Sequence, residues 1–195
     1  MDIKVDHVSK AYGEQQVLRD LSCVFPEGKT TCIRGRSGSG KTTLIQLLLR
    51  LDVPDKGKIE GISDRKISAV FQEDRLCENL SAASNIRLVC TETITDRELE
   101  EAYEAVALTE IWQKPVRELS GGMRRRVSIL RALLAESDCV IMDEPLRGLD
   151  EKTRAKTIDY ILKKTEGKTL IFVTHEEKEA VWLKADRTVD ILTKH

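Results

Sequence analysis

Residues 35–43 read GRSGSGKTT and match the pattern Gly-x-x-x-x-Gly-Lys-Thr at every specified position. The β-rich stretch KTTCIRG at 29–35 runs into the first glycine, and the helix-forming stretch KTTLIQLLLRL at 41–51 follows the last one. A strand, a glycine-rich loop and a helix in this order hold phosphate groups on backbone N–H groups at a helix N-terminus. Glycines suit this loop because the absence of a Cβ lets the backbone turn its N–H groups toward an anion. The stretch therefore predicts a nucleoside triphosphate site within an α/β fold.

The side chains of this loop have distinct expected roles. Lys41 should reach the β- and γ-phosphates, and the Thr42 hydroxyl should coordinate Mg²⁺. The other positions expected to contact the nucleotide are Gly35, Ser37, Gly38, Ser39, Gly40 and Thr43.

Two acidic residues end another apolar run, DCVIMDEP at 138–145. A strand buried on both faces delivers its terminal carboxylates to the sheet edge where the phosphate loop also opens. Asp143 can then hold Mg²⁺, directly or through water, while Glu144 orients and deprotonates an attacking water. Two solvated acids at a strand end are the ordinary alternative, which the accompanying phosphate loop disfavours.

The rest of the chain alternates strands with helices. Two antiparallel strands, Ile3–Val8 and Val17–Phe25, are expected on either side of a turn that begins at Gly13. Further strands are expected at 29–35, 66–72, 138–145, 168–175 and 187–192, with helices at 41–51, about 120–135, 151–165 and 176–184. This alternation implies a mainly parallel sheet covered on both faces, with function at the carboxyl ends of its strands.

Residues 73–118 differ in character and are expected to form a helical insertion. The stretch at 95–108 opens with a capping-box pair, Thr95 and Glu98. The apolar residues at helical spacing, which are expected to face inward, are Leu99, Ala102, Tyr103 and Val106.

Two later helices have apolar faces at the same spacing. The expected inner face of the helix after Ser120 is Met123, Val127, Leu130 and Leu134. The expected inner face of the helix at 151–165 is Ala155, Ile158, Ile161 and Leu162.

The composition argues against several classes of protein. The net charge is −1, without the basic excess typical of nucleic-acid binders. No apolar run approaches the roughly 18 residues of a membrane span, and the N-terminus lacks the apolar stretch of a secretory signal. Five scattered cysteines are expected to be buried reduced thiols, and three separated histidines predict no metal site made of protein ligands alone.

Three segments together resemble those of ABC-type ATPases. GRSGSGKTT at 35–43, LSGGM at 119–123 and VIMDEP at 140–145 look like the Walker A, signature and Walker B segments, in the family's order and at its intervals. The resemblance implies an ATP- and Mg²⁺-dependent P-loop NTPase with a RecA-like core, an antiparallel β subdomain and a helical subdomain. It implies a single ABC ATPase domain over 1–195: the β subdomain and first part of the core in 1–72, the helical subdomain in 73–118, and the signature helix and remaining core in 119–195.

Four further positions fit the same family. Tyr12 resembles the aromatic residue that stacks on adenine, and Gln72 the Q-loop glutamine that contacts Mg²⁺ and water. His175 resembles the switch histidine that contacts the γ-phosphate, and Asp150 closes the sequence RGLD, which resembles the D-loop. Taken singly, a tyrosine that ends a strand or a lone histidine after one is ordinarily structural. Their joint occurrence in the right order favours the functional interpretation.

The resemblance gives the signature segment a role in a second molecule. Ser120, Gly121 and Gly122 would hold the γ-phosphate bound to the partner's Walker A segment, in a head-to-tail homodimer with two identical sites. A helix N-terminus with a hydroxyl and two residues without Cβ atoms can approach a phosphate closely. An N-capped helix would explain Ser120 equally well, but not the two glycines.

Three features depart from the family pattern. Met123 stands where glutamine is commonest, so a hydrogen bond to the partner's nucleotide is lost, and Arg147-Gly148 replace the usual Ser-Ala of the D-loop. The short stretch between Lys41 and Gln72 implies a trimmed antiparallel subdomain. None of these changes a residue expected to bind phosphate or activate water, so activity is expected to survive.

A single cassette of this kind resembles the energising subunit of a bacterial transporter, peripheral on the cytoplasmic face of the membrane. The implied partners are membrane permease subunits and a second cassette, with a substrate-binding protein as a further candidate and no nucleic acid. Because 20 residues follow His175, no appended regulatory domain is expected. The alternatives are a non-transport ABC ATPase, either a cell-division-type regulator of a membrane complex or one associated with ribosomes or nucleic acid; a P-loop kinase is disfavoured by the signature segment.

The stretch after Gln72 indicates a branch of the family. FQEDRL followed by Asn85, together with LSGGMRRRV, is most similar to the nitrate/sulfonate/taurine importers, although residues 77–80 replace their usual Pro-Trp. Candidate permease contacts are Leu76, Cys77, Leu80 and Ile86, with core positions as the alternative.

Overall fold

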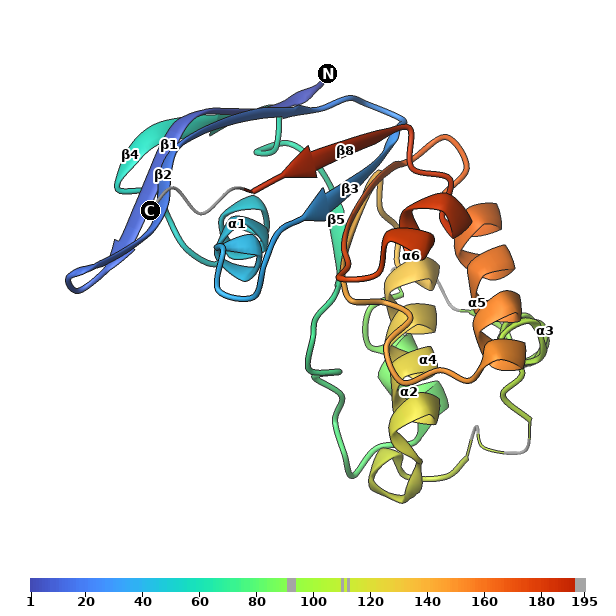
Figure 1. Ribbon diagram of the computed structural model, residues 1–195. Coiled ribbons are helices and arrows are strands. Elements are labelled where there is room, and N and C mark those ends of the chain that lie inside the picture. The colour runs from blue at the N-terminus through green and yellow to red at the C-terminus, as the bar shows by residue number, and fades with distance from the viewer. Residues whose placement is uncertain (91–93, 110, 112, 192–195) are drawn as a thin grey trace.

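The computed structural model describes residues 1–90, 94–109, 111 and 113–191. A three-stranded antiparallel sheet has the order β2-β1-β4, and a five-stranded parallel sheet has the order β5-β6-β7-β3-β8 (Figure 1). The antiparallel strands are β1 (Ile3–Tyr12), β2 (Gln15–Phe25) and β4 (Lys56–Glu60). The parallel strands are β3 (Thr30–Arg34), β5 (Ile67–Val70), β6 (Cys139–Asp143), β7 (Thr169–Val173) and β8 (Arg187–Asp190). The expectation of a mainly parallel sheet with an antiparallel β part is confirmed.

Helices cover both sides of the parallel strands (Figure 1). The helix α1 (Lys41–Leu48) lies on the side of the antiparallel sheet. The other helices gather on the opposite side: α2 (Ala82–Arg87), α3 (Asp96–Ala105), α4 (Gly121–Leu134), α5 (Glu151–Lys164) and α6 (Glu177–Trp182), with a short 3₁₀ turn, η1 (Val116–Glu118). Among the described residues no helix has the length and apolar character that crossing a bilayer requires.

Two hydrophobic cores lie on opposite faces of the parallel sheet, and the alternation of side chains along one strand feeds both. On β6, Cys139 and Ile141 join the core beneath the antiparallel sheet and α1, while Val140 and Met142 join the core beneath the helices. All five residues of β6 are buried, as in a strand covered on both faces. This strand therefore brings its last residue, Asp143, to the sheet edge in a rigid setting.

The boundaries of several elements differ from the expected ones. The strand β1 continues to Tyr12, and α1 stops at Leu48 because Arg50, two residues on, adopts a left-handed backbone with φ 57°. The edge strand β4 was not expected, because its residues are mostly exposed and show no apolar alternation. Part of the expected strand at 187–192 lies outside the described residues.

The expected inner face of α5 was correct only in part: Ile161 is fully buried and Ile158 packs against the core, but the other positions differ. Ala155 is exposed and Ile158 and Leu162 are only half-buried, whereas the buried residues are Thr157, Tyr160 and Ile161. A threonine was overlooked as an inner residue because its hydroxyl is polar, yet Thr157 Oγ1 donates to the Thr153 carbonyl at 2.7 Å and is thereby satisfied within the helix.

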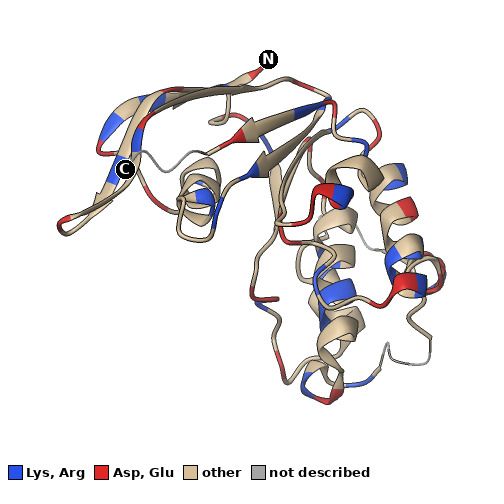
Figure 2. Ribbon diagram, viewed as in Figure 1, with Lys and Arg blue, Asp and Glu red and all other residues tan. Residues whose placement is uncertain are grey.

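The helices α3 and α4 match expectation in part. The capping box of Thr95 and Glu98 is formed, and the predicted inner residues of α3 are buried. On α4, Met123 and Leu134 are half-buried, while two arginines, Arg125 and Arg126, are buried against expectation. Charges of both signs are distributed over the β part and the helical part (Figure 2).

Candidate active site

One cavity of about 300 Å³ gathers most of the residues selected from the sequence. It is lined by Tyr12, Gln15, Val17, Ser37, Gly38, Gly40, Lys41, Thr42, Thr43, Gln72, Asp143, Glu144 and His175. They come from the β1–β2 hairpin, from the loop before α1 and the start of that helix, from the last residue of β6 and from the segments that follow β5, β6 and β7. Gln15 and Val17 were not expected; their signal was the alternation of β2, which places Val17 against the start of α1.

Two of the three glycines in the loop at 35–43, Gly35 and Gly40, are required by close packing, whereas a Cβ at Gly38 would meet nothing within 4 Å. Gly40 caps α1 with φ 96°, and a Cβ added there would lie 2.6 Å from Leu18 Cδ2. A Cβ at Gly35 would lie 2.4 Å from Ser39 Oγ. Gly35 and Ser39 belong to the same loop but do not line the cavity, and Ser39 Oγ is buried without a hydrogen-bond partner in the described structure. The loop is thus a tight backbone cradle with a free hydroxyl.

Lys41 holds its charge over this cradle. Its Nζ donates to the carbonyl oxygens of Gly35 at 2.8 Å and Arg36 at 2.9 Å. Burial lowers the pKa of Lys41, and the nearby carboxylates of Glu144 and Asp143 oppose that shift. A bound phosphate would supply a stronger charge-assisted partner for the ammonium than these neutral carbonyls do.

Asp143 ends β6 and is only 5% exposed. Burial, followed by the repulsion of Glu144, raises the pKa of Asp143, while Arg125, Lys41 and His175 lower it. A divalent cation at this position would favour the ionised carboxylate. Oxygen donors of Thr42, Gln72 and Asp143 line the same cavity, and oxygen is the ligand type that Mg²⁺ prefers. The donor set therefore fits Mg²⁺ shared with phosphate oxygens.

In this arrangement the phosphate oxygens would supply part of the Mg²⁺ coordination, so protein side chains alone need not complete it. The residues that the structure describes contain no group of three or more His, Cys, Asp or Glu side chains placed to hold a metal ion.

Glu144 is held in an unusual backbone conformation. Its φ is 49°, a left-handed value that costs a non-glycine residue roughly 1–2 kcal/mol. Both carboxylate oxygens are engaged: His175 Nε2 lies 2.7 Å from Oε1, and Arg147 Nη1 donates to Oε2 at 3.3 Å. The carboxylate is therefore fixed at the edge of the cavity, between the segments that follow β6 and β7.

Tyr12 stands at the rim of the cavity, about half exposed. Its hydroxyl donates to Asp52 Oδ2 at 2.8 Å, and Lys10 Nζ donates to Asp52 Oδ1 at 2.7 Å. These hydrogen bonds, from Lys10 first and then from Tyr12, hold the pKa of Asp52 at about 2. Asp52 thus fixes the direction of an exposed ring, a role the sequence did not reveal because Asp52 and Tyr12 are far apart along the chain.

The signature residues lie outside this cavity. Ser120 Oγ accepts from Met123 N at 3.3 Å and caps α4, and a Cβ at Gly122 would lie 3.2 Å from the Gly148 carbonyl oxygen. Asp150 caps α5 by accepting from Thr153 N at 3.1 Å. These residues have structural roles within the chain, whereas a Cβ at Gly121 would meet nothing within 4 Å. Contacts within the chain therefore do not explain why residue 121 of the signature segment is a glycine.

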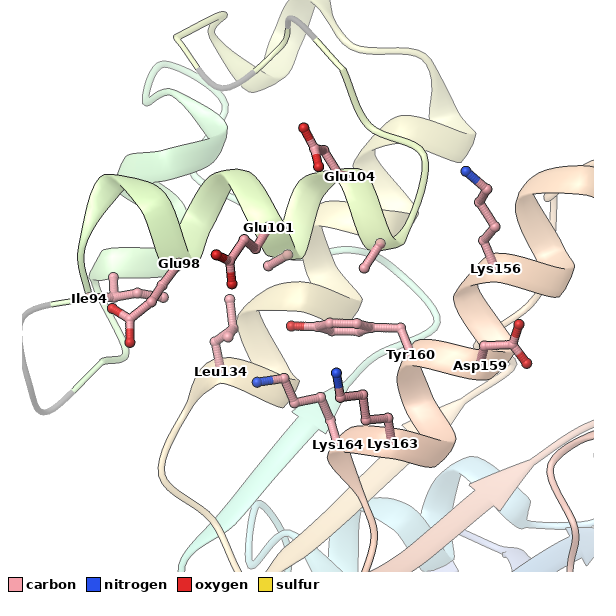
Figure 3. Close-up of a pocket in the computed structure, with 12 residues that line it drawn as sticks. Ile94, Glu98, Glu101, Glu104, Leu134, Lys156, Asp159, Tyr160, Lys163 and Lys164 are labelled. Carbon is pink, nitrogen blue, oxygen red and sulfur yellow. The ribbon is translucent and has the colours of Figure 1, made fainter.

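A second cavity, of about 550 Å³, lies between α3 and α5 (Figure 3). Carboxylates of Glu98, Glu101 and Glu104 line one side and the lysines of α5 the other, around the ring of Tyr160. It is larger than the cavity at the phosphate loop, but its mixed charges do not favour a polyanion. Size alone would therefore select the wrong cavity for a nucleotide.

The expected permease contacts divide into two groups. Ile86 is fully buried on α2 and Leu76 is half-buried against the same core, whereas Leu80 and Cys77 are exposed. The exposure of Cys77 also corrects the expectation that all the thiols are buried. The loop that carries Cys77 is held by Asn85, which accepts from Cys77 N at 2.7 Å and donates to its carbonyl at 3.0 Å.

Comparisons with known proteins identify the family of this chain. The sequence matches the family described as ABC transporter over residues 18–147. It is 36% identical to the sulfate/thiosulfate import ATP-binding protein CysA of Synechococcus elongatus, over 92% of this chain and 57% of that protein. It is 36% identical to the aliphatic sulfonates import ATP-binding protein SsuB 1 of Rhizobium johnstonii, over 96% of this chain and 72% of that protein.

A solved structure has a similar fold. The dimeric ATP-binding cassette MJ0796, bound to ADP and Pi, superposes with a TM-score of 0.83 at 28% identity, over 97% of this chain and 94% of that one. The chain spans little more than half the length of CysA and of another relative, the carnitine transport ATP-binding protein OpuCA of Listeria monocytogenes, to which it is 36% identical. On the family match and the shared fold, the chain belongs to the ABC transporter family and is an ATP-binding cassette.

Proposed function

We propose that this chain binds and hydrolyses ATP and that the hydrolysis energises a membrane transporter. The observation that carries the proposal is the convergence of Lys41, Gln72, Asp143, Glu144 and His175 on one cavity, at the mouth of a glycine cradle. These residues come from separate segments of the chain, so their meeting is a property of the fold. Together they supply each of the groups that phosphoryl transfer to water needs.

The cavity residues would divide the work of binding. The N–H groups of the loop at 35–43 and the ammonium of Lys41 hold the phosphates, and the fixed ring of Tyr12 stacks on adenine. Thr42, Gln72 and Asp143 would hold Mg²⁺, which when bound neutralises phosphate charge in the transition state.

Glu144 would act as the general base. Its carboxylate orients the attacking water and accepts the water's proton at a carboxylate oxygen. His175, 2.7 Å from that carboxylate, keeps it aimed and contacts the γ-phosphate. The left-handed backbone of Glu144 serves this aim, because strained conformations at such sites are held by the surrounding structure for function.

We also propose a homodimer in which the exposed signature segment of each chain acts on its partner's nucleotide. Ser120, Gly121 and Gly122 would contact the γ-phosphate held by the partner's loop at 35–43. The open space around Gly121 and the dimeric state of the MJ0796 cassette support this arrangement.

The proposed system is an importer, with the cassette peripheral on the cytoplasmic face of a permease. Two relatives are named for import, of sulfate/thiosulfate and of aliphatic sulfonates, and a third is named for carnitine transport. Each is 36% identical to this chain, so the proposal names no cargo. Leu76, Cys77 and Leu80 are the proposed permease contacts, and a substrate-binding protein is a further proposed partner.

The decisive test of the chemistry is Glu144→Gln, which retains the shape of the side chain but removes the base. We expect the rate of ATP hydrolysis to fall by roughly 10²- to 10⁴-fold while ATP binding is retained. The variant should accumulate as an ATP-dependent dimer, measured by light scattering. Hydrolysis at the wild-type rate would refute the assignment of the base, and a monomer at saturating ATP and Mg²⁺ would refute the role of Ser120 in the partner's site.

A separate experiment tests transport. The tagged chain is purified from gently solubilised membranes of its native host, and the proteins that accompany it are identified. A multi-span permease is the expected partner. Recovery of soluble partners or ribosomes alone would contradict the transport proposal while leaving the ATPase chemistry in place.

A further inference from the structure

A buried arginine on the signature helix connects the two loops that carry the expected catalytic groups. Arg125 is 4% exposed, and its guanidinium makes five hydrogen bonds, as many as it has N–H donors. Four of the five acceptors are backbone carbonyl oxygens, and the fifth is a carboxylate. A side chain so fully bonded is positioned for a purpose other than solvation.

One side of the guanidinium holds the backbone on both sides of Glu144. Nη2 donates to the carbonyl oxygen of Asp143 and, at 2.5 Å, to that of Glu144. These carbonyls belong to the two peptide groups that flank the Glu144 Cα atom. Fixing both peptide groups fixes the φ and ψ of Glu144, whose left-handed φ of 49° a free chain would abandon. Nε extends the contact to the Pro145 carbonyl oxygen at 3.3 Å.

The other side of the guanidinium holds the start of the segment that carries Gln72. Nη1 donates at 2.5 Å to the carbonyl oxygen of Phe71, which belongs to the peptide group that joins Phe71 to Gln72. It also donates to Asp74 Oδ1 at 3.2 Å, two residues beyond Gln72. One rigid planar group therefore sets the distance between the backbone of Gln72 and that of Glu144.

The residue type matters for this role. A lysine has three donors on a single atom and cannot reach two segments in one plane, whereas the arginine fork can. The buried cation is not a source of stability in itself: burial lowers the pKa of Arg125, which Asp74 and the two site carboxylates only oppose. What an apolar residue of similar size could not provide is the set of hydrogen bonds by which Arg125 holds two segments of the chain at a fixed distance.

The next residue provides a matched comparison. Arg126 is also buried and also donates to backbone carbonyls, at 3.1 Å to Gly122, 3.0 Å to Val106 and 2.7 Å to Ala107. Ala107, like Glu144, has a left-handed backbone, with φ 55°. The first acceptor lies in the signature segment at the start of α4, and the other two follow α3. Arg126 therefore holds the helical part of the molecule, and none of these bonds reaches the segments of Gln72 and Glu144.

We propose that Arg125 is a positioning residue for ATP hydrolysis, which sets the backbone of Glu144 and Gln72 relative to each other from the signature helix. The proposal rests on the proposed ATPase function and deepens it. Because Arg125 sits on α4, whose N-terminus would face the partner's nucleotide, a shift of this helix on dimer formation moves both Gln72 and Glu144.

The test compares Arg125→Lys and Arg125→Gln with Arg126→Lys and Arg126→Gln in the full chain. We expect kcat for ATP hydrolysis to fall by about 10- to 100-fold in the Arg125 variants, as for an ångström-scale misplacement, with KM for ATP within about threefold of wild type. The Arg126 variants should lose comparable thermal stability but keep kcat within about threefold of wild type. Glu144→Asp shortens the side chain and moves the carboxylate away from the attacking water. In this background Arg125→Lys should cause a smaller loss of kcat than in wild type, because the carboxylate is already misplaced.

The outcomes separate the two proposals. Wild-type kcat in both Arg125 variants, or parallel losses of kcat in the Arg125 and Arg126 variants, would overturn the positioning role. Failure of both Arg125 variants to fold while the Arg126 variants fold would also overturn it, by showing a structural role. Failure of the proposed function itself appears elsewhere, as hydrolysis that Glu144→Gln does not reduce or as a wild-type chain that hydrolyses no ATP.

Discussion

The segments at 35–43 and 119–123 are alike in sequence and unlike in setting. Each places serine and glycine at the N-terminus of a helix, α1 in one case and α4 in the other. Gly40 begins α1 with a left-handed backbone packed against β2, and the cavity in front of it also receives Lys41 and two carboxylates. Ser120 begins α4 with an ordinary side-chain cap, and Gly121 beside it is exposed.

The difference shows that a helix N-terminus is only part of a phosphate site. At α1 the parallel sheet delivers the proposed catalytic groups from the ends of neighbouring strands to the same place. The N-terminus of α4 lies outside the cavity that contains these groups. We therefore expect a partner molecule to supply the groups that would complete a phosphate site at α4. Substitutions at matched glycines can test this contrast directly.

Gly40→Ala should have the largest effect of the substitutions that test the contrast. The new Cβ requires an unfavourable backbone at φ 96° and lies 2.6 Å from Leu18 Cδ2. Together these effects should lower the free energy of unfolding by about 2–5 kcal/mol. The melting temperature should fall by several degrees and nucleotide binding should be lost, which calorimetry with and without ATP would measure.

Gly13→Ala is the control for this measurement. Gly13 has φ 60°, but a Cβ there meets nothing within 4 Å, so only the backbone term applies. Equal losses in the two variants would mean that packing against β2 does not shape the loop at 35–43.

Gly121→Ala should leave the monomer intact and affect only association. A Cβ there meets no atom of its own chain within 4 Å, and alanine suits a helix better than glycine by up to about 1 kcal/mol. In the Glu144→Gln background we expect ATP to bind normally but the ATP-dependent dimer to weaken by roughly tenfold, as for one lost close contact of about 1.4 kcal/mol. An undiminished dimer in sedimentation would show that the signature segment is not approached by a partner's phosphate.

Asp52→Asn should have the smallest effect, confined to the rim of the first segment's cavity. The loss of the hydrogen bond that anchors the Tyr12 ring should weaken ATP binding by about two- to fivefold in a fluorescence titration. Because the pKa of Asp52 is lowered, the stabilising effect of its carboxylate is complete above the ordinary pKa of 3.8 and is lost as the pH falls through about 2. The difference in ATP affinity between variant and wild type should therefore be constant from pH 5 to pH 8.

Asp55→Asn is the matched control for this titration, because Asp55 also approaches Lys10, at 3.5 Å, and bonds to Ala11 N. Equal losses of affinity in the two variants would assign the effect to Lys10 rather than to Tyr12.

Local patterns were sufficient where a short-range rule determines the structure. The capping box of Thr95 and Glu98 and the burial of β6 follow from spacing and apolar content alone. Local rules were insufficient for β4, which is a strand because β1 pairs with it, and for Thr157, which is buried because its helix satisfies its hydroxyl. Ile86 was a candidate surface residue by sequence and is a core residue by packing.

The sequence by itself determined which groups the proposed chemistry uses: a glycine cradle with Lys41 and Thr42, the acids Asp143 and Glu144, and a second glycine-containing helix start. These are fixed by covalent order, since each needs only the spacing of neighbouring residues. The tertiary structure alone decided which of them meet, because a parallel sheet aligns the ends of strands that are distant in sequence. It also buried Arg125 between the Gln72 and Glu144 segments, since only packing brings a helix residue within hydrogen-bond reach of both.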